Sequence, residues 1–172
     1  EGGLDGPARI VAATSQLSNI ARESPFPLGA ARLEGELRSA RGTTAIHATL
    51  DAQQIDGLGQ RTRLTGPVEA ALTSASFTLD ADLRAPTQTS PLFANARLRT
   101  TLEYDRGRGR FELNRTDLTS DAMKVTAQGW VNGADGEFSG EWRALRLDAL
   151  APDLRGEAGG LWRAFRDGDG DT

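Results

Sequence analysis

Apolar and polar residues alternate with a period of two along most of the sequence. In segment 31–38, Leu33, Gly35 and Leu37 fall on one side, and the charged residues between them fall on the other. Such alternation places apolar side chains on one face of a β-strand and polar side chains on the opposite face. The pattern recurs in segments 46–51, 77–84, 92–105, 110–113, 123–131 and 137–142. The chain is therefore predicted to be mainly β.

Turn residues separate several of these segments. Asp105-Arg-Gly107, Asn132-Gly133 and Asp135-Gly136 supply positions that tolerate a positive φ angle, as tight hairpins require. Tight hairpins join antiparallel neighbours. The strands are therefore predicted to follow one another as an antiparallel meander.

Signals for helices are weak. Segment 14–22 is a candidate for a short helix that ends before Pro25 and Pro27, and segment 157–166, with Leu161, Trp162 and Phe165, is a second candidate. Two short helices are too few to cover a broad sheet. The predicted fold class is a mainly β, curved antiparallel meander, a β-taco-like open sheet or groove, with one or two short helices.

The apolar face of such a sheet has three possible fates. It can close on itself as a sandwich or barrel, stack on neighbouring segments, or line a groove occupied by an apolar ligand. Its residues are mainly Ala and Gly with scattered Leu, Phe and Val, which would fill a sandwich core thinly. A partly open apolar channel fits this composition better. The residues expected to line it are Phe77, Leu79, Leu92, Ala96, Leu98, Phe111, Val125, Ala127, Val131 and Phe138.

Length and the two chain ends predict one unit that belongs to something longer. Residues 1–172 are long enough for one domain, and no change in composition divides them. The sequence begins at Glu1 without a Met, so we expect a segment of a longer repetitive protein. It contains neither an apolar run of bilayer length nor a signal peptide. A membrane anchor is therefore expected only in other parts of the parent protein.

Composition excludes several classes of partner and cofactor. The formal net charge of −4 argues against nucleic acid, because neutralising phosphates requires a concentrated basic surface. The absence of Cys excludes disulfides, thiolate chemistry and Cys-based zinc sites. No cofactor is expected.

Residues 107–147 resemble a repeated unit of the AsmA-like family, which includes TamB and YdbH. The resemblance lies in GRFEL at 109–113, Leu118, MKVTAQGWV at 123–131 and EFSGEWRALRL at 137–147. Segment 30–56 is similar to a looser copy, and segment 147–156 is similar to the link into a following repeat. The resemblance rests on the spacing of apolar residues and covers about half of the chain.

This resemblance implies a location and a function. The parent protein would lie in the periplasm of a Gram-negative bacterium, tethered to the inner membrane. Phospholipid acyl chains would be the partners, carried between inner and outer membrane along the apolar groove. The alternative is a structural or assembly module that helps outer-membrane protein biogenesis through an exposed sheet edge. A carbohydrate-processing or carbohydrate-binding sandwich ranks lower. It would require an exposed aromatic platform, and only Trp130 points clearly to the polar face.

The residues that most resemble catalytic groups have simpler explanations. His47 is the sole histidine and falls on the polar side of its strand, where an exposed residue is expected. Asp80 and Asp82 share one strand face, a spacing that glycoside chemistry can use but that alternation alone also produces. No catalytic residue and no enzymatic activity are therefore predicted.

Two charged clusters raise the question of ligands. Arg106, Arg108 and Arg110 at a hairpin could contact lipid phosphates or an acidic partner, although acidic residues nearby favour a solvated hairpin. The C-terminal DGDGD repeats the start of a calcium loop, but the rest of an EF-hand is missing, so an acidic linker is the better interpretation. No metal site is predicted.

Overall fold

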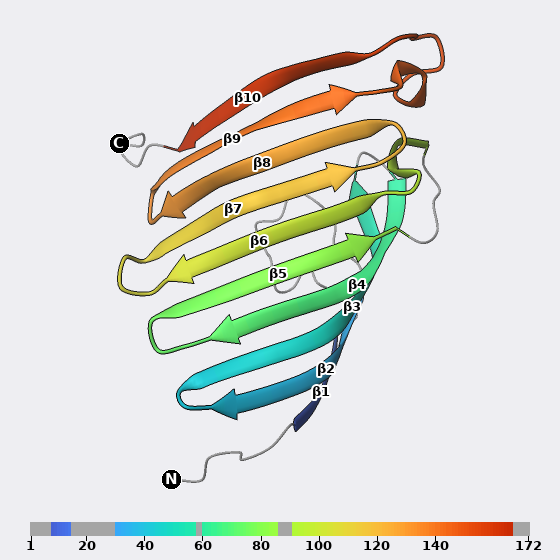
Figure 1. Ribbon diagram of the computed structural model, residues 1–172. Coiled ribbons are helices and arrows are strands. Elements are labelled where there is room, and N and C mark those ends of the chain that lie inside the picture. Colours follow the sequence, from blue (N-terminus) through green and yellow to red (C-terminus); the bar gives the residue numbers. More distant parts are fainter. Residues whose placement is uncertain (1–7, 15–29, 58–59, 86–90, 167–172) are drawn as a thin grey trace.

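The computed structural model describes residues 8–14, 30–57, 60–85 and 91–166. These residues form a single antiparallel sheet of ten strands whose spatial order is the chain order, β1 to β10. Figure 1 shows the strands stacked from β1 at one end to β10 at the other. The predicted curved antiparallel meander is confirmed.

Each strand pairs with the strand before it and the strand after it. The strands are β1 (Ala8–Thr14), β2 (Ala31–Ala40), β3 (Thr43–Gly57), β4 (Gln60–Leu72), β5 (Ser76–Arg84), β6 (Arg97–Asp105), β7 (Arg110–Thr119), β8 (Met123–Asn132), β9 (Asp135–Ala144) and β10 (Ala158–Arg166). The helical structure in the described residues consists of two single 3₁₀ turns, η2 (Pro91–Phe93) and η3 (Leu147–Ala149).

Two of the three predicted turns form hairpins. Asp105 accepts hydrogen bonds from the backbone N–H groups of Gly107 and Arg108, at 2.8 and 3.1 Å, and so closes the β6–β7 turn. Gly133 has φ +59° in the β8–β9 turn, a conformation that suits glycine. The predicted turn at Asp135-Gly136 is wrong, because both residues already pair with β8 as the first residues of β9.

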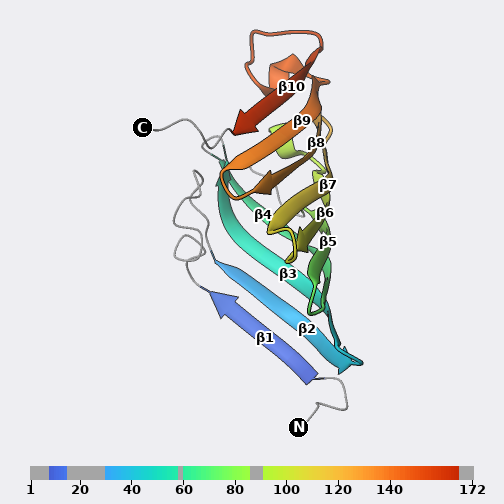
Figure 2. The same ribbon diagram turned by 90° about the vertical axis from the view of Figure 1, so that its left-hand side faces the viewer.

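Register irregularities give the sheet its curvature. The β3–β4 ladder shifts register between Ala52 and Ile55, and β7 shifts against both of its neighbours around Asn114 and Arg115. Extra residues of this kind bend a strand and increase its twist. Figure 2 shows β3 and β4 bending away from the plane of β5 to β9, so the sheet has a concave and a convex side.

No second layer covers the sheet in the described part of the chain. None of its large side chains is fully buried, and most buried hydrophobic residues are alanines. Several of them, including Leu92, Ala96 and Ala122, lie in a corner where strand ends meet. Ser120 Oγ donates to the carbonyl of Leu92 at 2.6 Å, and the N–H of Ala85 donates to the carbonyl of Ala96 at 2.9 Å.

This corner corrects the prediction of a strand starting at Leu92. Segment 91–93 is a 3₁₀ turn and β6 begins only at Arg97, because Asn95 takes a left-handed conformation with φ +55° that breaks the strand. The predicted helix at 157–166 is also wrong, since Ala158–Arg166 is strand β10. The helix predicted at 14–22 falls largely on residues 15–22, outside the described residues.

Candidate functional site

Strand pairing sorts the side chains onto two faces. Residues directly opposite one another on neighbouring strands point to the same side of a sheet. Leu79 on β5 pairs with Leu102 on β6, which pairs with Leu113 on β7. Apolar residues therefore form rows that run across the strands, parallel to the strand order.

Three such rows occupy the middle of one face. The first contains Leu37, Ile46, Ala70, Leu79, Leu102, Leu113, Gly129 and Phe138. The second contains Gly35, Ala48, Val68, Ala81, Thr100, Thr116, Ala127 and Gly140. The third contains Leu83, Leu98, Leu118, Val125 and Trp142, with Leu33 and Leu50 in the corresponding position on β2 and β3. A fourth row beside the first contains Phe77, Tyr104, Phe111 and Val131, and we call the whole of this side the apolar face.

The middle row consists of small or short side chains. Its neighbours on either side carry Leu, Ile, Phe and Trp, about 6.6 Å away along each strand. The apolar face is therefore lower along its centre line than along its two flanks. Thr100 and Thr116 are the polar members of the row, and their hydroxyls hydrogen bond to each other at 2.7 Å. That pairing leaves their polarity largely satisfied within the sheet.

The apolar face is open to its surroundings. Among the described residues of β2 to β9, no charged side chain points to this face. Most of its large residues are only partly buried, and Phe111 and Trp142 are 43% and 39% exposed. Exposed apolar patches of this extent usually mark an interaction surface.

The structure brings eight of the ten predicted groove residues onto this face. Phe77 and Leu79 come from β5, Leu98 from β6, Phe111 from β7, Val125, Ala127 and Val131 from β8, and Phe138 from β9. Phe111 also stacks on Tyr104, with ring centroids 4.2 Å apart.

The other two predicted groove residues lie elsewhere. Leu92 and Ala96 are only 7% and 3% exposed, because both are packed in the corner at the strand ends. They do not belong to the rows of the apolar face. Regular alternation had placed them there, and the left-handed Asn95 interrupts it.

Trp162 was not predicted as part of this face, where it interlocks with Trp142, which the alternation of segment 137–142 places there. Trp142 on β9 lies opposite Gly160 on β10, and Trp162 on β10 lies opposite Gly140 on β9. A Cβ atom on Gly140 would meet the Trp162 ring at 2.7 Å, so each indole covers the space over a glycine. Alternation did not assign Trp162 to a face, because β10 carries apolar residues on both of its faces.

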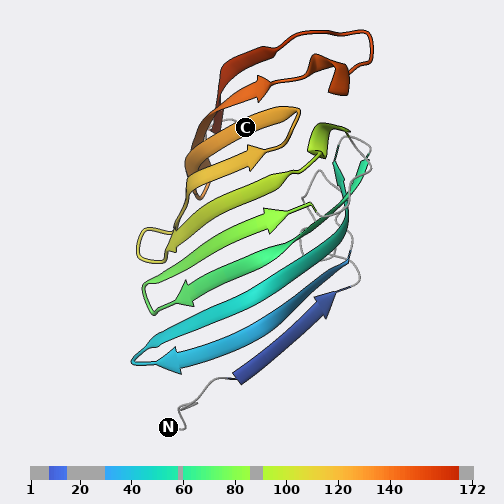
Figure 3. The same ribbon diagram turned by 45° about the vertical axis from the view of Figure 1, so that its right-hand side comes forward.

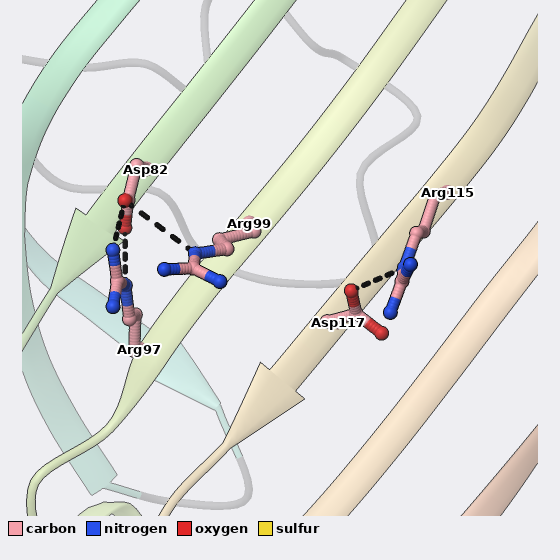
Figure 4. Close-up of polar contacts among 5 residues, drawn as sticks. All are labelled: Asp82, Arg97, Arg99, Arg115 and Asp117. Atoms are coloured by element: carbon pink, nitrogen blue, oxygen red, sulfur yellow. Dashed lines mark hydrogen bonds and ion pairs between the residues drawn. The ribbon is translucent and has the colours of Figure 1, made fainter.

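The opposite, convex face is covered by charged and hydroxyl side chains. We call it the charged face. Ion pairs connect neighbouring strands here, with one partner on each strand: Arg9 with Glu34, Arg63 with Asp51, Arg97 with Asp82, and Arg163 with Glu137. Figure 4 looks onto this face, and β3 and β4 pass behind the sheet. The apolar face is therefore the concave one.

Asp82 has the most strongly perturbed acid–base equilibrium on the charged face. Arg97 donates to both of its carboxylate oxygens, with an Nε–Oδ1 distance of 2.6 Å, and Arg99 Nε lies 3.5 Å from Oδ2. These hydrogen bonds, with the positive charges of Arg97, Arg99 and Arg84, lower the pKa of Asp82 from 3.8 to about 2. The ionised Asp82 carboxylate thus links β5 to β6 through ion pairs on the charged face.

The lowered pKa predicts how stability depends on pH. Because the folded pKa lies below the unfolded one, the Asp82 contribution is fully present above about pH 4 and is lost as the pH falls through 2. In urea unfolding, Asp82→Asn should be less stable than the parent chain at pH 7, and the difference should shrink to a small remainder near pH 2 and vanish below it. Arg97→Gln should show the same dependence, since it removes the other partner. A stability difference that persists unchanged at pH 2 would contradict this assignment.

The residues that resembled catalytic groups belong to this charged face. His47 is exposed and its Nδ1 lies 3.7 Å from Glu69 Oε1. Asp80 accepts a hydrogen bond from Thr101 Oγ1 at 2.6 Å. A hollow of about 680 Å³ over β7 to β10 contains Asp117 and Glu141, and each is ion-paired with an arginine of its own strand.

Two further observations concern the described residues as a whole. No group of three His, Cys, Asp or Glu side chains lies close enough together there to hold a metal ion. None of the helical segments there has the length and apolar character needed to cross a membrane. The candidate functional site is the apolar face, because it is open and carries no charged side chain on the described residues of β2 to β9.

No protein-family model, curated protein or solved structure matches this chain.

Proposed function

We propose that this chain is a segment of a periplasmic bridge-like protein that carries phospholipid between the inner and outer membranes along its apolar face. The observation that carries the proposal is the uncharged, uncovered apolar face across β2 to β9. The resemblance of residues 107–147 to the AsmA-like repeat supports the same function and supplies the periplasmic location and the inner-membrane tether.

The direction of the rows favours transport along the sheet. Seven spacings of about 4.8 Å give a path about 34 Å long from β2 to β9, slightly longer than the roughly 30 Å hydrocarbon core of a bilayer. A fixed binding pocket would be enclosed, whereas this surface continues from strand to strand. An extended acyl chain can lie along the row of small residues with the larger side chains on either side.

The chemistry of the face favours sliding. Thr100 and Thr116 hydrogen bond to each other, so they offer a passing lipid little polar attraction. Without a charged group on the face from β2 to β9, a phospholipid headgroup has no partner to fix it. The headgroup therefore remains in water at the open side, and the acyl chain gains mainly hydrophobic contact. Hydrophobic contact has no preferred direction, so it does not hold the acyl chain at one position along the face.

The three tryptophans allow this proposal to be tested in the purified chain. Trp142 and Trp162 lie on the apolar face, whereas Trp130 lies on the charged face with the Arg110 guanidinium 4.5 Å from its ring centroid. Phospholipid with brominated acyl chains, presented as vesicles of phosphatidylethanolamine and phosphatidylglycerol, should quench the fluorescence of Trp130→Phe. The Trp142→Phe/Trp162→Phe double variant should resist quenching.

The control separates capture in the groove from adsorption. A vesicle that adsorbs through the charged face would quench Trp130 at least as strongly as the other two. Equal quenching of both variants, or none in either, would refute the proposal. Non-brominated vesicles of the same composition correct for changes in fluorescence that do not arise from contact with acyl chains.

The alternative, assembly of outer-membrane proteins, depends on an open edge of the sheet. In the described residues, β1 and β10 each have a neighbour on one side only. Titration with an isolated β-hairpin peptide of an outer-membrane protein separates the two functions. Saturable peptide binding without acyl-chain quenching of Trp142 and Trp162 would favour the alternative.

A further inference from the structure

One row of the charged face carries positive charge and no acid. Directly opposed residues across β5 to β9 form this row, which consists of Arg84, Arg97, Thr119, Lys124 and Arg143. Figure 3 shows these strands side by side, coloured green to orange. Like charges directly opposite one another destabilise a sheet, and the row contains two such pairs, Arg84 with Arg97 and Lys124 with Arg143. We call these five residues the basic row.

The acids of the charged face compensate the basic row only in part. Arg143 Nε lies 4.0 Å from Glu141 Oε1, but in the described part of the chain the ammonium group of Lys124 has no ion-pair partner. The nearest directly opposed acids lie further along the strands, about 13 Å away or more: Glu69 with Asp80, and Glu103 with Glu112. That separation exceeds the Debye length of about 8–10 Å at physiological salt. The basic row therefore attracts anions.

A hollow of about 310 Å³ lies beside the basic row, over β6 to β8. Its charged lining consists of one acid, Asp117, and four cations, Arg97, Arg99, Arg115 and Lys124. Two of the arginines are held in place by ion pairs, since Arg97 binds Asp82 of β5 and Arg115 Nε binds Asp117 of its own strand (Figure 4). In both of them, Nη1 makes no hydrogen bond to a described residue, so it can donate to a ligand.

We propose that this hollow binds a phosphate monoester group, free in solution or as a lipid headgroup. With Asp82, four positive and two negative charges meet at the hollow, and a phosphate monoester, which carries about −1.5 to −2 charges at pH 7, neutralises the excess. Guanidinium groups also match the geometry of phosphate oxygens. The volume of about 310 Å³ lies at the lower end of small-ligand sites, roughly 300–1,000 Å³. Because the site lies on the charged face, it can exist with or without lipid transport on the apolar face.

Calorimetric titration of the full chain with inorganic phosphate and with glycerol phosphate, at low ionic strength, measures the affinity. Each ligand should bind saturably with a Kd on the order of 1 mM or below. Lys124→Gln should raise the Kd about tenfold or more, because a hydrogen bond to a charged group contributes about that factor. The control is Arg38→Gln, which changes the net charge equally at an exposed residue of β2 that is paired with Glu36. It should leave the Kd unchanged.

Thr119→Glu places a carboxylate between the two like-charged pairs of the basic row. Thr119 is exposed and lies directly opposite both Arg97 and Lys124, so the new carboxylate takes the place of the bound anion. This variant should lose phosphate binding, and its melting temperature should rise by about 2–4 °C, because opposite charges now face each other across the strands. Thr119→Gln has the same length without the charge. It should keep both the affinity and the melting temperature of the parent chain.

Phosphatidylcholine vesicles with and without phosphatidic acid distinguish the two sources, since phosphatidic acid presents a phosphate monoester at the membrane surface. Cosedimentation that requires phosphatidic acid and is lost in Lys124→Gln would assign the site to a lipid headgroup. Saturable binding of glycerol phosphate without such cosedimentation would assign it to a soluble ligand. The proposal is overturned if neither source binds, if Arg38→Gln weakens binding as much as Lys124→Gln, or if Thr119→Glu binds phosphate like the parent chain.

Discussion

Replacing Val125 by arginine should abolish the capture of phospholipid and leave the sheet folded. Val125 lies between Leu118 and Trp142 in a flanking row of the apolar face and is only partly buried. In the folded chain alone, a guanidinium at this position can remain hydrated. An acyl chain passing over it would remove that water at a cost of several kcal/mol. Capture should therefore fall at least tenfold, since each 1.4 kcal/mol corresponds to a factor of ten.

The matched control is the next residue along β8. Thr126→Arg places the same charge on the charged face, where it is exposed, and should leave capture unchanged. Capture is measured with photo-crosslinkers at Leu98 and at Arg97, which lie on opposite faces of β6. Folding is measured by circular dichroism and urea unfolding. If Val125→Arg unfolds the chain, or if Thr126→Arg reduces capture equally, the groove interpretation fails.

Ala96 is unsuitable for the same test, because it is 3% exposed in the corner at the strand ends. A carboxylate there would be buried in the folded chain itself. Ala96→Asp should therefore unfold the chain whether or not lipid passes, so a loss of function in this variant would carry no information about the groove.

Gly66→Val should strongly destabilise the chain. A Cβ atom at Gly66 would lie 2.0 Å from the backbone carbonyl oxygen of Asp82 on β5, which cannot move without breaking the β4–β5 pairing. Overpacking against backbone typically costs up to about 3 kcal/mol. For a chain of this size, that loss lowers the melting temperature by about 6–12 °C.

Thr65→Val is the control for this prediction. Thr65 is the neighbour of Gly66 on the charged face, where it pairs with Arg84. A valine there has almost the same shape as the threonine and meets no close backbone atom. Its melting temperature should stay within about 2 °C of the parent chain, in line with ordinary surface substitutions. Similar losses in both variants would show that close approach of β4 and β5 at Gly66 does not matter.

The sequence predicted the faces of the central strands well for a local reason. A period of two fixes the side to which each residue of a strand points, whatever the strand packs against. Phe77, Leu79, Val125 and Phe138 could therefore be assigned to the apolar face without knowledge of the fold. The charged positions between them determine the charged face in the same way.

Prediction from the sequence failed where contacts other than alternation decided the local structure. Leu92 and Ala96 continue the alternation of β6, yet backbone hydrogen bonds and the left-handed Asn95 turn them into a corner. Strand β10 is apolar on both sides, so its Leu161, Trp162 and Phe165 were compatible with the spacing of a helix. The contacts that decide both cases come from residues distant in the sequence.

The sequence by itself determined that the chain forms antiparallel strands with one apolar and one charged face, because alternation and turn residues act over a few neighbouring positions. Only the tertiary structure decided the order of neighbours, the rows that run across the strands and the side toward which the sheet bends. These features depend on register between strands, which changes at the bulges in β3 and β7. Register is a property of paired segments, so no single segment contains it.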